Sequence, residues 1–225
     1  LIDACIENKV EKIIALSTDK AAAPYNLYGA TKLVSDKLFV NSNFYRGKMK
    51  YSASVVRYGN VFASRGSVFE VIMKLDKTQK ISITDPEMTR FSIEIEAGVN
   101  FVIQCIKRMW GGEIFIPKLQ SYKVKDIIKA VGVSKDKIQI IGSRPGEKKH
   151  EEMISKDNGK DTVDFDDYYV ILPSSRIWDE NKFIKNSHSK KGVKCKESFS
   201  YVSNKNEFLK VNDLKKLIKK YNNEI

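Results

Sequence analysis

The chain has 225 residues, 42% of them hydrophobic, which is enough for one large domain or two small ones with ample cores. The formal net charge of +12 could indicate nucleic-acid binding, but the lysines are scattered along the chain, so we expect no nucleic-acid partner. No apolar run is long enough to span a bilayer, and three widely spaced cysteines predict neither disulfides nor a zinc site, as in a reducing cytoplasm.

The first part of the chain predicts a helix, a buried strand and a second helix. Residues 1–9 carry apolar side chains at helical spacing and lead into the apolar run 13–16, a predicted parallel strand. The polar segment STDK (17–20) follows at the carboxyl end of this strand, where open α/β sheets bind their ligands. Pro24 is expected to open the second helix, which extends to about Asn43.

Tyr28 and Lys32 lie four residues apart on this second helix, so the phenol and the ammonium share one face. A lysine beside a tyrosine stabilises the phenolate, which suits proton transfer to or from a hydroxyl group. The spacing alone is common, and a half-buried tyrosine beside a solvated lysine would explain it equally well. The apolar residues of the same helix predict a core-facing stripe made of Leu27, Leu33, Val34, Leu38 and Phe39.

The segment RYGNVFASRGSV (57–68) follows the next predicted strand, 51–57. Asn60 offers an amide to a ligand, and Arg65 offers a guanidinium that suits phosphate. Arg57 is a second candidate for phosphate, with a structural cation at the strand end as the alternative.

Two more arginines follow downstream. Arg90 follows a predicted short strand, and Arg144 opens the string RPGEKKHE, which is expected to form a loop and the start of a helix. With the two arginines of the preceding segment, they would supply planar donors to a ligand with two phosphates, if the fold brings them together. His150, in the same string, is expected to pack structurally rather than to act as an acid or base.

The rest of the chain alternates helices and strands. Helices are predicted over residues 68–75, 95–108 and 124–131 and at the C-terminus, and strands over 113–117, 134–141 and 168–173. Asp164, Asp166 and Asp167 do not fit a calcium loop and predict a solvated hairpin. The helix over 95–108 has a predicted core-facing stripe of Val99, Val102, Ile103 and Ile106, and Gly111-Gly112 is expected to end it.

These motifs together resemble the extended short-chain dehydrogenase/reductase superfamily, and within it the inverting sugar-nucleotide 4,6-dehydratases of polysaccharide biosynthesis. The long strings RYGNVFASRGSV and RPGEKKHE carry most of the resemblance, which covers nearly the whole chain. It implies an α/β fold: the C-terminal part of a Rossmann-type doubly wound parallel sheet plus a smaller α/β substrate-binding region. Residues 1–67 would belong to the dinucleotide-binding domain, and 68–225 mainly to an interleaved nucleotide-sugar-binding region with a C-terminal helix.

The resemblance also implies roles for single residues. Thr18, Tyr28 and Lys32 would form the catalytic set beside a nicotinamide ring, and Asp19 and Lys20 would perform an elimination as acid and base. An Asp-Lys pair after the threonine, instead of Asp-Glu, speaks for inversion. The cofactor would be NADP, with NAD possible, and no metal is expected. The cofactor-binding residues would be Tyr28, Lys32, Tyr58 and Gly59, and the substrate-binding residues Arg57, Asn60, Arg65, Arg90, Arg144 and Glu147.

The implied activity is the NADP-dependent 4,6-dehydration of UDP-N-acetylglucosamine with inversion at C5, for pseudaminic acid or related surface-glycan synthesis in the cytoplasm by a homo-oligomer. A 4-epimerase, or a dehydratase for another sugar, would need Tyr28 and Lys32 without needing Asp19 and Lys20. A non-catalytic nucleotide-sugar-binding module is a third reading, disfavoured because both Tyr28 and Lys32 are present. The glycine-rich turn that would seat a pyrophosphate is not found in the sequence, so we expect an N-terminally truncated chain that is inactive alone.

Overall fold

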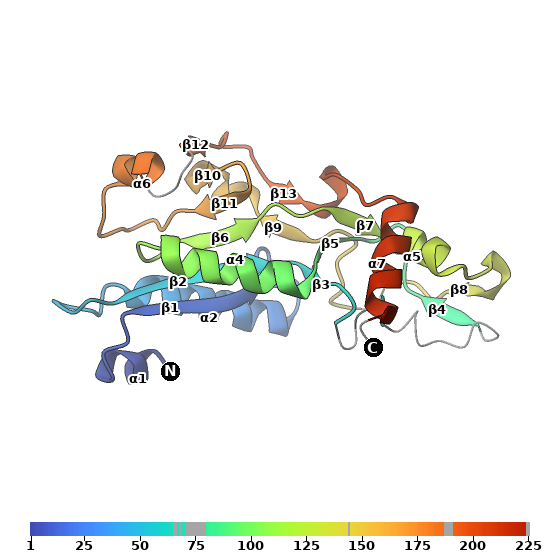
Figure 1. Cartoon of the computed structure of the whole chain (residues 1–225), viewed down its shortest axis with the longest axis horizontal. Coiled ribbons are helices and arrows are strands. Elements are labelled where there is room, and N and C mark those ends of the chain that lie inside the picture. The colour runs from blue at the N-terminus through green and yellow to red at the C-terminus, as the bar shows by residue number, and fades with distance from the viewer. Residues whose placement is uncertain (65–66, 68, 71–79, 144, 187–190, 224–225) are drawn as a thin grey trace. The chain divides into compact units, whose positions relative to one another are not determined.

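The computed structural model forms two compact units, each assembled from separate stretches of the chain (Figure 1). It describes residues 1–64, 67, 69–70, 80–143, 145–186 and 191–223. Unit 1 comprises residues 1–58, 96–118 and 152–201, and unit 2 comprises residues 59–95, 119–151 and 202–225. The chain first changes unit after Tyr58, before the expected boundary at residue 67. That the units serve the dinucleotide and the sugar nucleotide, respectively, stays a prediction.

Unit 1 is built around a six-stranded sheet in the order β1-β2-β6-β11-β10-β12. Its first three strands run parallel: β1 (Lys12–Thr18), β2 (Ser52–Tyr58) and β6 (Ile114–Pro117). The sheet continues antiparallel through β11 (Tyr168–Ile171), β10 (Thr162–Asp164) and β12 (Val193–Lys194). The parallel part confirms the predicted Rossmann-type α/β class, and β10 and β11 form the hairpin expected around the three aspartates.

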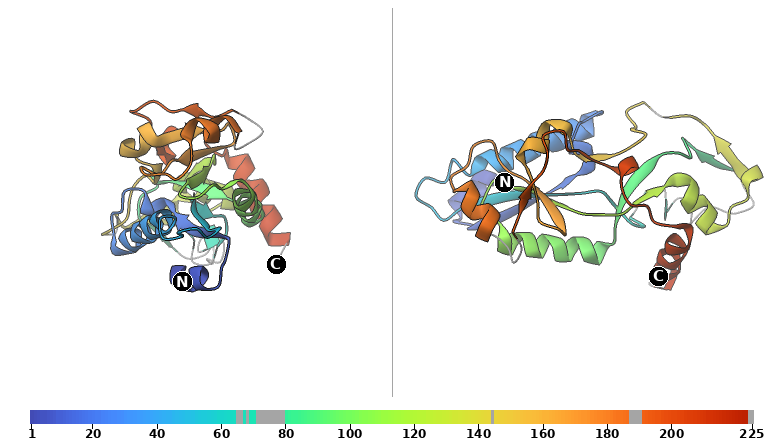
Figure 2. Two further views of the ribbon diagram at one scale, coloured as in Figure 1. Left: turned by 90° about the vertical axis from the view of Figure 1, so that its left-hand side faces the viewer. Right: turned by 90° about the horizontal axis from the view of Figure 1, so that it is seen from above.

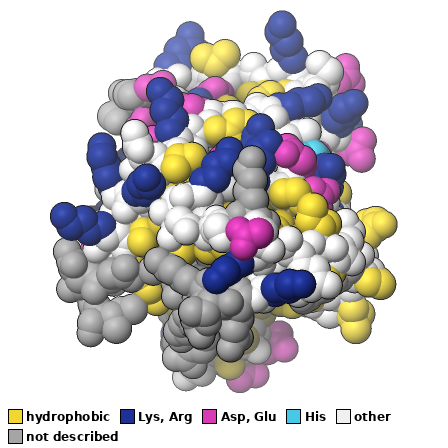
Figure 3. Space-filling model, turned by 90° about the vertical axis from the view of Figure 1, so that its right-hand side faces the viewer, with side chains coloured by type: hydrophobic (Ala, Val, Ile, Leu, Met, Phe, Trp, Pro, Cys, Tyr) yellow, Lys and Arg dark blue, Asp and Glu magenta, His cyan; other side chains and the backbone are white. Residues whose placement is uncertain are grey.

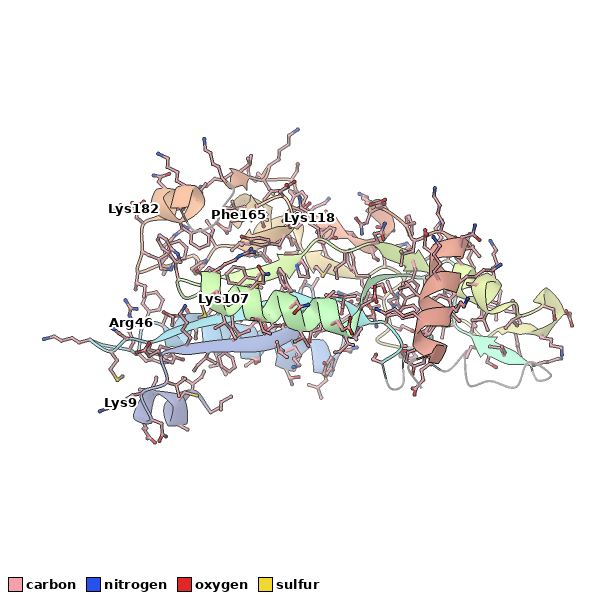
Figure 4. All side chains as sticks on the ribbon, in the orientation of Figure 1. Lys9, Arg46, Lys107, Lys118, Phe165 and Lys182 are labelled. Carbon is pink, nitrogen blue, oxygen red and sulfur yellow. The ribbon has the colours of Figure 1, made fainter. Side chains whose placement is uncertain are left out.

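Two helices, α2 (Leu27–Ser42) and α4 (Ile95–Arg108), cover opposite faces of this sheet (Figure 2). Side chains of a strand alternate between the faces. Val56 of β2 accordingly packs with Cys105 of α4, whereas its neighbour Arg57 binds Asp36 of α2. The cluster on the α4 side includes stacked aromatic rings, among them Phe165, which Figure 4 labels.

A buried carboxylate, Glu113, holds the turn that follows α4. Its Oε1 accepts a hydrogen bond from Trp110 N (2.5 Å), and its Oε2 accepts from Gly111 N (2.8 Å) and Ser54 Oγ (2.5 Å). Burial raises the pKa of Glu113, and these three hydrogen bonds oppose that shift. Gly111 and Gly112 have φ values of 113° and 95°, which favour glycine, so the predicted glycine end of the helix is confirmed.

The predicted contact face of α2 is wrong in part. The helix begins at Leu27, after an Asn26 cap whose Oδ1 accepts from Gly29 N at 2.8 Å, rather than at Pro24. Leu27, Val34 and Leu38 are 80%, 58% and 54% exposed, while Leu33 and Phe39 are partly buried. The reason is that α2 docks through a stripe of small and polar residues, and its buried members are Gly29, Asp36 and Ser42.

The predicted contact face of α4 is also largely wrong. Val99, Ile103 and Ile106 are 50%, 45% and 39% exposed, and of the predicted stripe only Val102 packs against the core. The helix instead turns toward the sheet with the face that carries its buried residues, Gly98 and Cys105, and the partly buried Phe101.

Unit 2 contains a small sheet in which β5 (Thr89–Ile93) is central. This strand is parallel to β3 (Asn60–Val61) and antiparallel to β7 (Ser121–Lys123). A second pair consists of β4 (Ile81–Ile83) and β8 (Ile138–Ile140). The helix α5 (Val124–Val131) has its predicted bounds and shares an apolar core with α7 (Val211–Asn223). Most of the predicted helix over 68–75 lies outside the described residues.

Within the described residues, no helix combines the length and apolar character needed to cross a membrane. On the face that Figure 3 shows, basic side chains are spread among acidic and apolar ones.

The remaining elements are short. They are α1 (Ile2–Glu7), β9 (Glu152–Ile154), α6 (Glu180–Asn186), β13 (Tyr201–Val202) and the 3-10 turns η1 (Asp19–Ala21), η2 (Lys135–Lys137), η3 (Lys156–Asp161) and η4 (Ser203–Lys205).

Candidate active site

The carboxyl end of β1 places a hydroxyl, a carboxylate and an ammonium in mutual contact. Thr18 Oγ1 donates to Asp19 Oδ1 (2.8 Å), and Lys20 Nζ donates to the same oxygen (3.0 Å). Thr18 also caps η1, because its hydroxyl oxygen accepts from Lys20 N at 3.4 Å. Asp19 is fully buried, and its second oxygen, Oδ2, has no hydrogen-bond partner among the described residues. The arrangement can hold and exchange a proton.

The N-terminal part of α2 brings the predicted tyrosine and lysine to the same edge of the sheet. Lys32 Nζ donates to the carbonyl oxygen of Leu16 in β1 (3.3 Å), while Tyr28 is 53% exposed. Tyr58, at the end of β2, has its pKa raised by burial and, to a smaller degree, by the charge of the Tyr28 phenolate. The three predicted residues at the end of β1, together with Tyr28, Lys32 and Tyr58, therefore all belong to this part of unit 1.

The start of α2 approaches η1 as closely as the backbone permits. A Cβ atom at Gly29 would lie 2.4 Å from the carbonyl oxygen of Lys20, so only glycine fits there. Between the two elements, Ala23 has φ of 123°, a conformation that non-glycine residues adopt only when their surroundings impose it. The link between residues 18–20, here called the acid–base segment, and α2 is therefore short, crowded and strained.

Arg57 does not have the environment expected of a ligand-binding arginine. Its guanidinium donates through Nη2 to Asp36 Oδ2 and through Nη1 to the carbonyl oxygen of Met153, both at 2.9 Å. The side chains of Arg57 and Asp36 are only 3% and 2% exposed. These contacts favour the alternative raised above, a structural cation at the end of a strand.

A second group of predicted residues lies in unit 2, on β3, β5 and the loop that follows β8. Asn60 Oδ1 is buried without a hydrogen-bond partner among the described residues. Arg90 Nη2 lies 3.6 Å from Glu147 Oε1, and Arg90 Nε lies 3.5 Å from Glu151 Oε1. Arg90 Nη1 also donates to the carbonyl oxygens of Thr89 (2.8 Å) and residue 149 (3.1 Å). These bonds join Arg90 to the loop that carries its acidic neighbours.

His150 belongs to a hydrogen-bond chain that closes this loop. Its Nδ1 lies 2.8 Å from Thr89 Oγ1, which in turn lies 2.6 Å from Ser203 Oγ. Burial lowers the pKa of His150, and the nearby positive charges of Lys149 and Arg90 lower it further. The packing role predicted for His150 fits these contacts, although residues 145–151 form a turn and a bridge rather than a helix start.

The structure thus shows two groups of predicted residues, one in each unit. Gly59, the remaining predicted cofactor residue, belongs to unit 2, where its backbone packs against Phe91. Arg65 and Arg144 lie outside the described residues. Sequence reasoning missed Asp36, although a signal exists: it stands four residues after Lys32 and eight after Tyr28, on the same helical face.

A sheet whose first three strands are parallel, with Thr18 at the end of β1 and Tyr28 and Lys32 on the helix that follows, defines a Rossmann-type α/β protein. The chain belongs to the polysaccharide biosynthesis protein family, whose model matches residues 1–173.

The chain is also similar to several named proteins. Over 209 residues the chain is 51% identical to a UDP-N-acetylglucosamine 4,6-dehydratase (inverting) from Campylobacter jejuni, covering 92% of this chain and 62% of that protein. It is 33% identical to a UDP-glucose 4-epimerase from Rickettsia canadensis, covering 97% and 64%. The solved structure of Pen from Bacillus thuringiensis superposes with a TM-score of 0.83 at 30% identity, covering 98% and 66%. The chain therefore spans less than two thirds of the length of these two curated relatives.

Proposed function

We propose that the full gene product is an inverting UDP-N-acetylglucosamine 4,6-dehydratase that forms a UDP-4-keto-6-deoxy-L-hexose. The observation that carries this proposal is the contact between Asp19 and Lys20, directly after Thr18 and beside the helix of Tyr28 and Lys32. Epimerisation at C4 needs the tyrosine and lysine, whereas an elimination also needs an acid and a base. The 51% identity to the Campylobacter jejuni dehydratase supports the same reaction.

In the proposed reaction, Tyr28 accepts the proton of the C4 hydroxyl, and Lys32 stabilises the phenolate form of Tyr28. A nicotinamide cofactor held beside Tyr28 and Lys32 would supply the hydride acceptor for C4 and the hydride donor for C6. Lys20 removes the C5 proton, which the C4 ketone has made acidic, and Asp19 protonates the C6 hydroxyl so that it leaves as water. Hydride addition at C6 of the C5–C6 double bond and protonation of C5 by solvent on the opposite face complete the product. Tyr28 releases its proton to solvent, so the net change is the loss of one water.

The contact between Lys20 and Asp19 offers a way to reset the pair after each elimination. Lys20 has then gained a proton and Asp19 has lost one. Their 3.0 Å separation allows that proton to pass directly from Nζ to Oδ1, which restores both groups for the next turnover.

The proposed cofactor is NADP, with NAD as the alternative. The exposed phenol of Tyr28 and the Lys32 ammonium held at the edge of β1 fit the nicotinamide end of such a molecule. Tyr58 and Gly59 are proposed to line its surroundings. The residues proposed to hold the UDP-sugar are Asn60, Arg65, Arg90, Arg144 and Glu147.

The proposal extends to the setting of the reaction. The product would enter pseudaminic acid or related surface-glycan synthesis in the cytoplasm. The full gene product is proposed to be a homo-oligomer, because α2 exposes the apolar side chains Leu27, Val34 and Leu38 at spacings of seven and four residues.

The deciding experiment is to incubate the full gene product with UDP-N-acetylglucosamine and NADP in deuterated water and to follow the sugar by NMR. The expected product is a 4-keto-6-deoxy sugar with deuterium at C5 and inverted configuration there. The retained configuration at C5, or a hydroxyl group that stays on C6, would contradict the proposal.

A 4-epimerase is the second candidate, favoured by the 33% identity to the Rickettsia canadensis epimerase. It predicts recovery of the C4 epimer with C6 still hydroxylated and would leave Asp19 and Lys20 without their assigned roles. A non-catalytic nucleotide-sugar-binding module predicts binding of the substrate without any product in the same experiment.

A further inference from the structure

The ion pair between Arg57 and Asp36 lies behind the acid–base segment, inside unit 1. The two side chains are almost fully buried, and their closest atoms, Nη2 and Oδ2, lie 2.9 Å apart. Arg57 Nε is also buried and has no hydrogen-bond partner among the described residues. The pair therefore remains in the protein interior although one of its donors is unsatisfied.

The pair connects the elements that enclose η1. In the β1–β2 register, Arg57 is paired with Ser17, the residue immediately before Thr18. Asp36 belongs to α2, whose Gly29 touches the backbone of η1. The carbonyl that Arg57 binds, that of Met153, belongs to β9, which also packs on η1. One guanidinium thus holds together β2, α2 and β9 around the segment that carries Asp19 and Lys20.

A cavity adjoins both the pair and the stretch of chain that follows Lys20. It has a volume of about 370 Å³, and its walls include Asp36, Arg57 and the backbone stretch 21–24 that links η1 to α2. The same stretch contains Ala23 with its strained φ of 123°. The link is crowded on the side of Gly29 and adjoins open space on the side of this cavity, so packing does not fix it from both sides.

The free energy of burying this pair also differs from that of an ordinary stabilising contact. Burying two charges costs nearly as much as their attraction returns, so apolar residues of similar volume would stabilise the fold equally well. What the charged pair adds is direction, because the guanidinium donates hydrogen bonds only in its own plane and at fixed angles. Such directional contacts suit a task in which position matters more than stability.

We propose that Arg57 and Asp36 form a positioning pair that sets the geometry of the Asp19–Lys20 segment relative to Tyr28 and Lys32. This inference rests on the proposed function and deepens it. The pair acts through the backbone of η1 and does not touch the substrate. Its loss should therefore impair the elimination at C5 and C6 more than the oxidation at C4, which depends on groups of α2.

The test uses the full gene product with Asp36→Asn, which keeps the shape of the side chain, and Arg57→Gln. Each variant should lower kcat by about tenfold or more, as small misplacements of catalytic groups do, with KM for UDP-N-acetylglucosamine changed by less than about twofold. The 4-keto sugar that still carries its C6 hydroxyl should accumulate relative to the dehydrated product. A double variant should be no slower than the worse single variant, because the two residues act as a unit.

Hydrogen exchange supplies a readout that does not depend on turnover. The amides of Lys20 and Ala22, which bond to Thr18 Oγ1 and the Asp19 carbonyl, should exchange about tenfold faster in both variants. Lys118→Gln, which breaks the ion pair with Asp164 in the same unit, serves as the matched control and should leave these amides unchanged.

These experiments distinguish a failure of the positioning role from a failure of the proposed dehydratase function. A KM raised about tenfold by Arg57→Gln, with Asp36→Asn at wild-type activity, would assign Arg57 to the ligand and overturn the inference. Unchanged exchange at residues 20–22 in Asp36→Asn would overturn it as well. If the wild-type protein makes another product, the proposed function fails, while faster exchange in the variants would still establish the positioning of η1.

Discussion

Asp19 and Arg57 are both buried, ionisable residues of unit 1, and their contacts give them different tasks. Arg57 directs two of its nitrogen atoms at fixed protein acceptors. Asp19 shares one oxygen with a threonine and a lysine and keeps the other buried without a partner among the described residues. The proposed elimination gives this oxygen of Asp19 a partner in the C6 hydroxyl, whereas Arg57 is already bound to protein groups through two of its three nitrogen atoms.

The acid–base assignment predicts different losses for different residues. Lys20→Met should reduce dehydration by about 10²- to 10⁴-fold, because the base for the C5 proton is gone, while oxidation at C4 persists. Tyr28→Phe should abolish both steps. Single-turnover NMR that follows the C4 ketone and C5 deuterium separately measures the two losses. Equal loss of both steps in Lys20→Met would contradict the division of labour.

His150 predicts a dependence of stability on pH. Its pKa in the folded protein is lowered, so the unfolded chain takes up a proton first, near pH 6.5, and the folded state loses stability as the pH falls below that value. Urea unfolding at pH 7.5 and 5.5 should show a smaller loss for His150→Gln than for the wild type. The same substitution at His188, the only other histidine of the sequence, gives the background. An identical loss in all three proteins would show that His150 does not contribute.

At the scale of elements, the position of helices in the chain was predictable and their contact faces were not. α5 has its predicted bounds, and α4 lies where its apolar pattern placed it. For α2 and α4, however, hydrophobicity selected a face that is largely exposed. The sequence pattern reports which residues are apolar. The docking of α2, however, depends on Gly29, which permits close approach, and on Asp36, which has a buried partner.

Gly29 provides the test of this docking. In an open helix, alanine instead of glycine gains up to about 1 kcal/mol. Here the new Cβ would lie 2.4 Å from the Lys20 carbonyl oxygen, and overpacking of this kind costs about 1–3 kcal/mol, so the clash should win. Gly29→Ala should therefore lower the unfolding midpoint and kcat together, whereas Ser35→Ala on the same helix should change neither strongly. A stabilised Gly29→Ala protein would show that the helix can shift away at no cost.

At the scale of the whole molecule, periodicity predicted where the candidate residues lie, and the motif strings predicted what they do. The apolar run 13–16 and the helix predicted after Pro24 placed residues 18–20 and the pair Tyr28 and Lys32 on adjacent elements, and the structure confirms that placement. The resemblance supplied their roles, which stay a prediction. It could not show that Arg57 is enclosed by protein groups, because Asp36 and Met153 come from distant parts of the chain. Burial of this kind is a property of the assembled unit, and no local pattern records it.

The exposed stripe of α2 gives a prediction at this scale. If it is an interface between copies of the protein, Leu38→Glu should convert an oligomer of the full gene product to smaller species, because a charge would replace an apolar contact. Sedimentation velocity measures the change, and Gln104→Glu, an exposed position of α4 on the other face of the sheet, adds the same charge as a control. An unchanged oligomer, or a monomeric wild type, would remove α2 from the interface.

The division of the chain into two interleaved units has a consequence for how such proteins can diversify. The chain passes between the units after residues 58, 95, 118, 151 and 201, so neither unit is encoded by one continuous stretch of gene. A single recombination event therefore cannot replace unit 2 as a cassette while it leaves unit 1 intact. Anyone who wishes to graft one unit onto another protein must therefore transplant three segments at once.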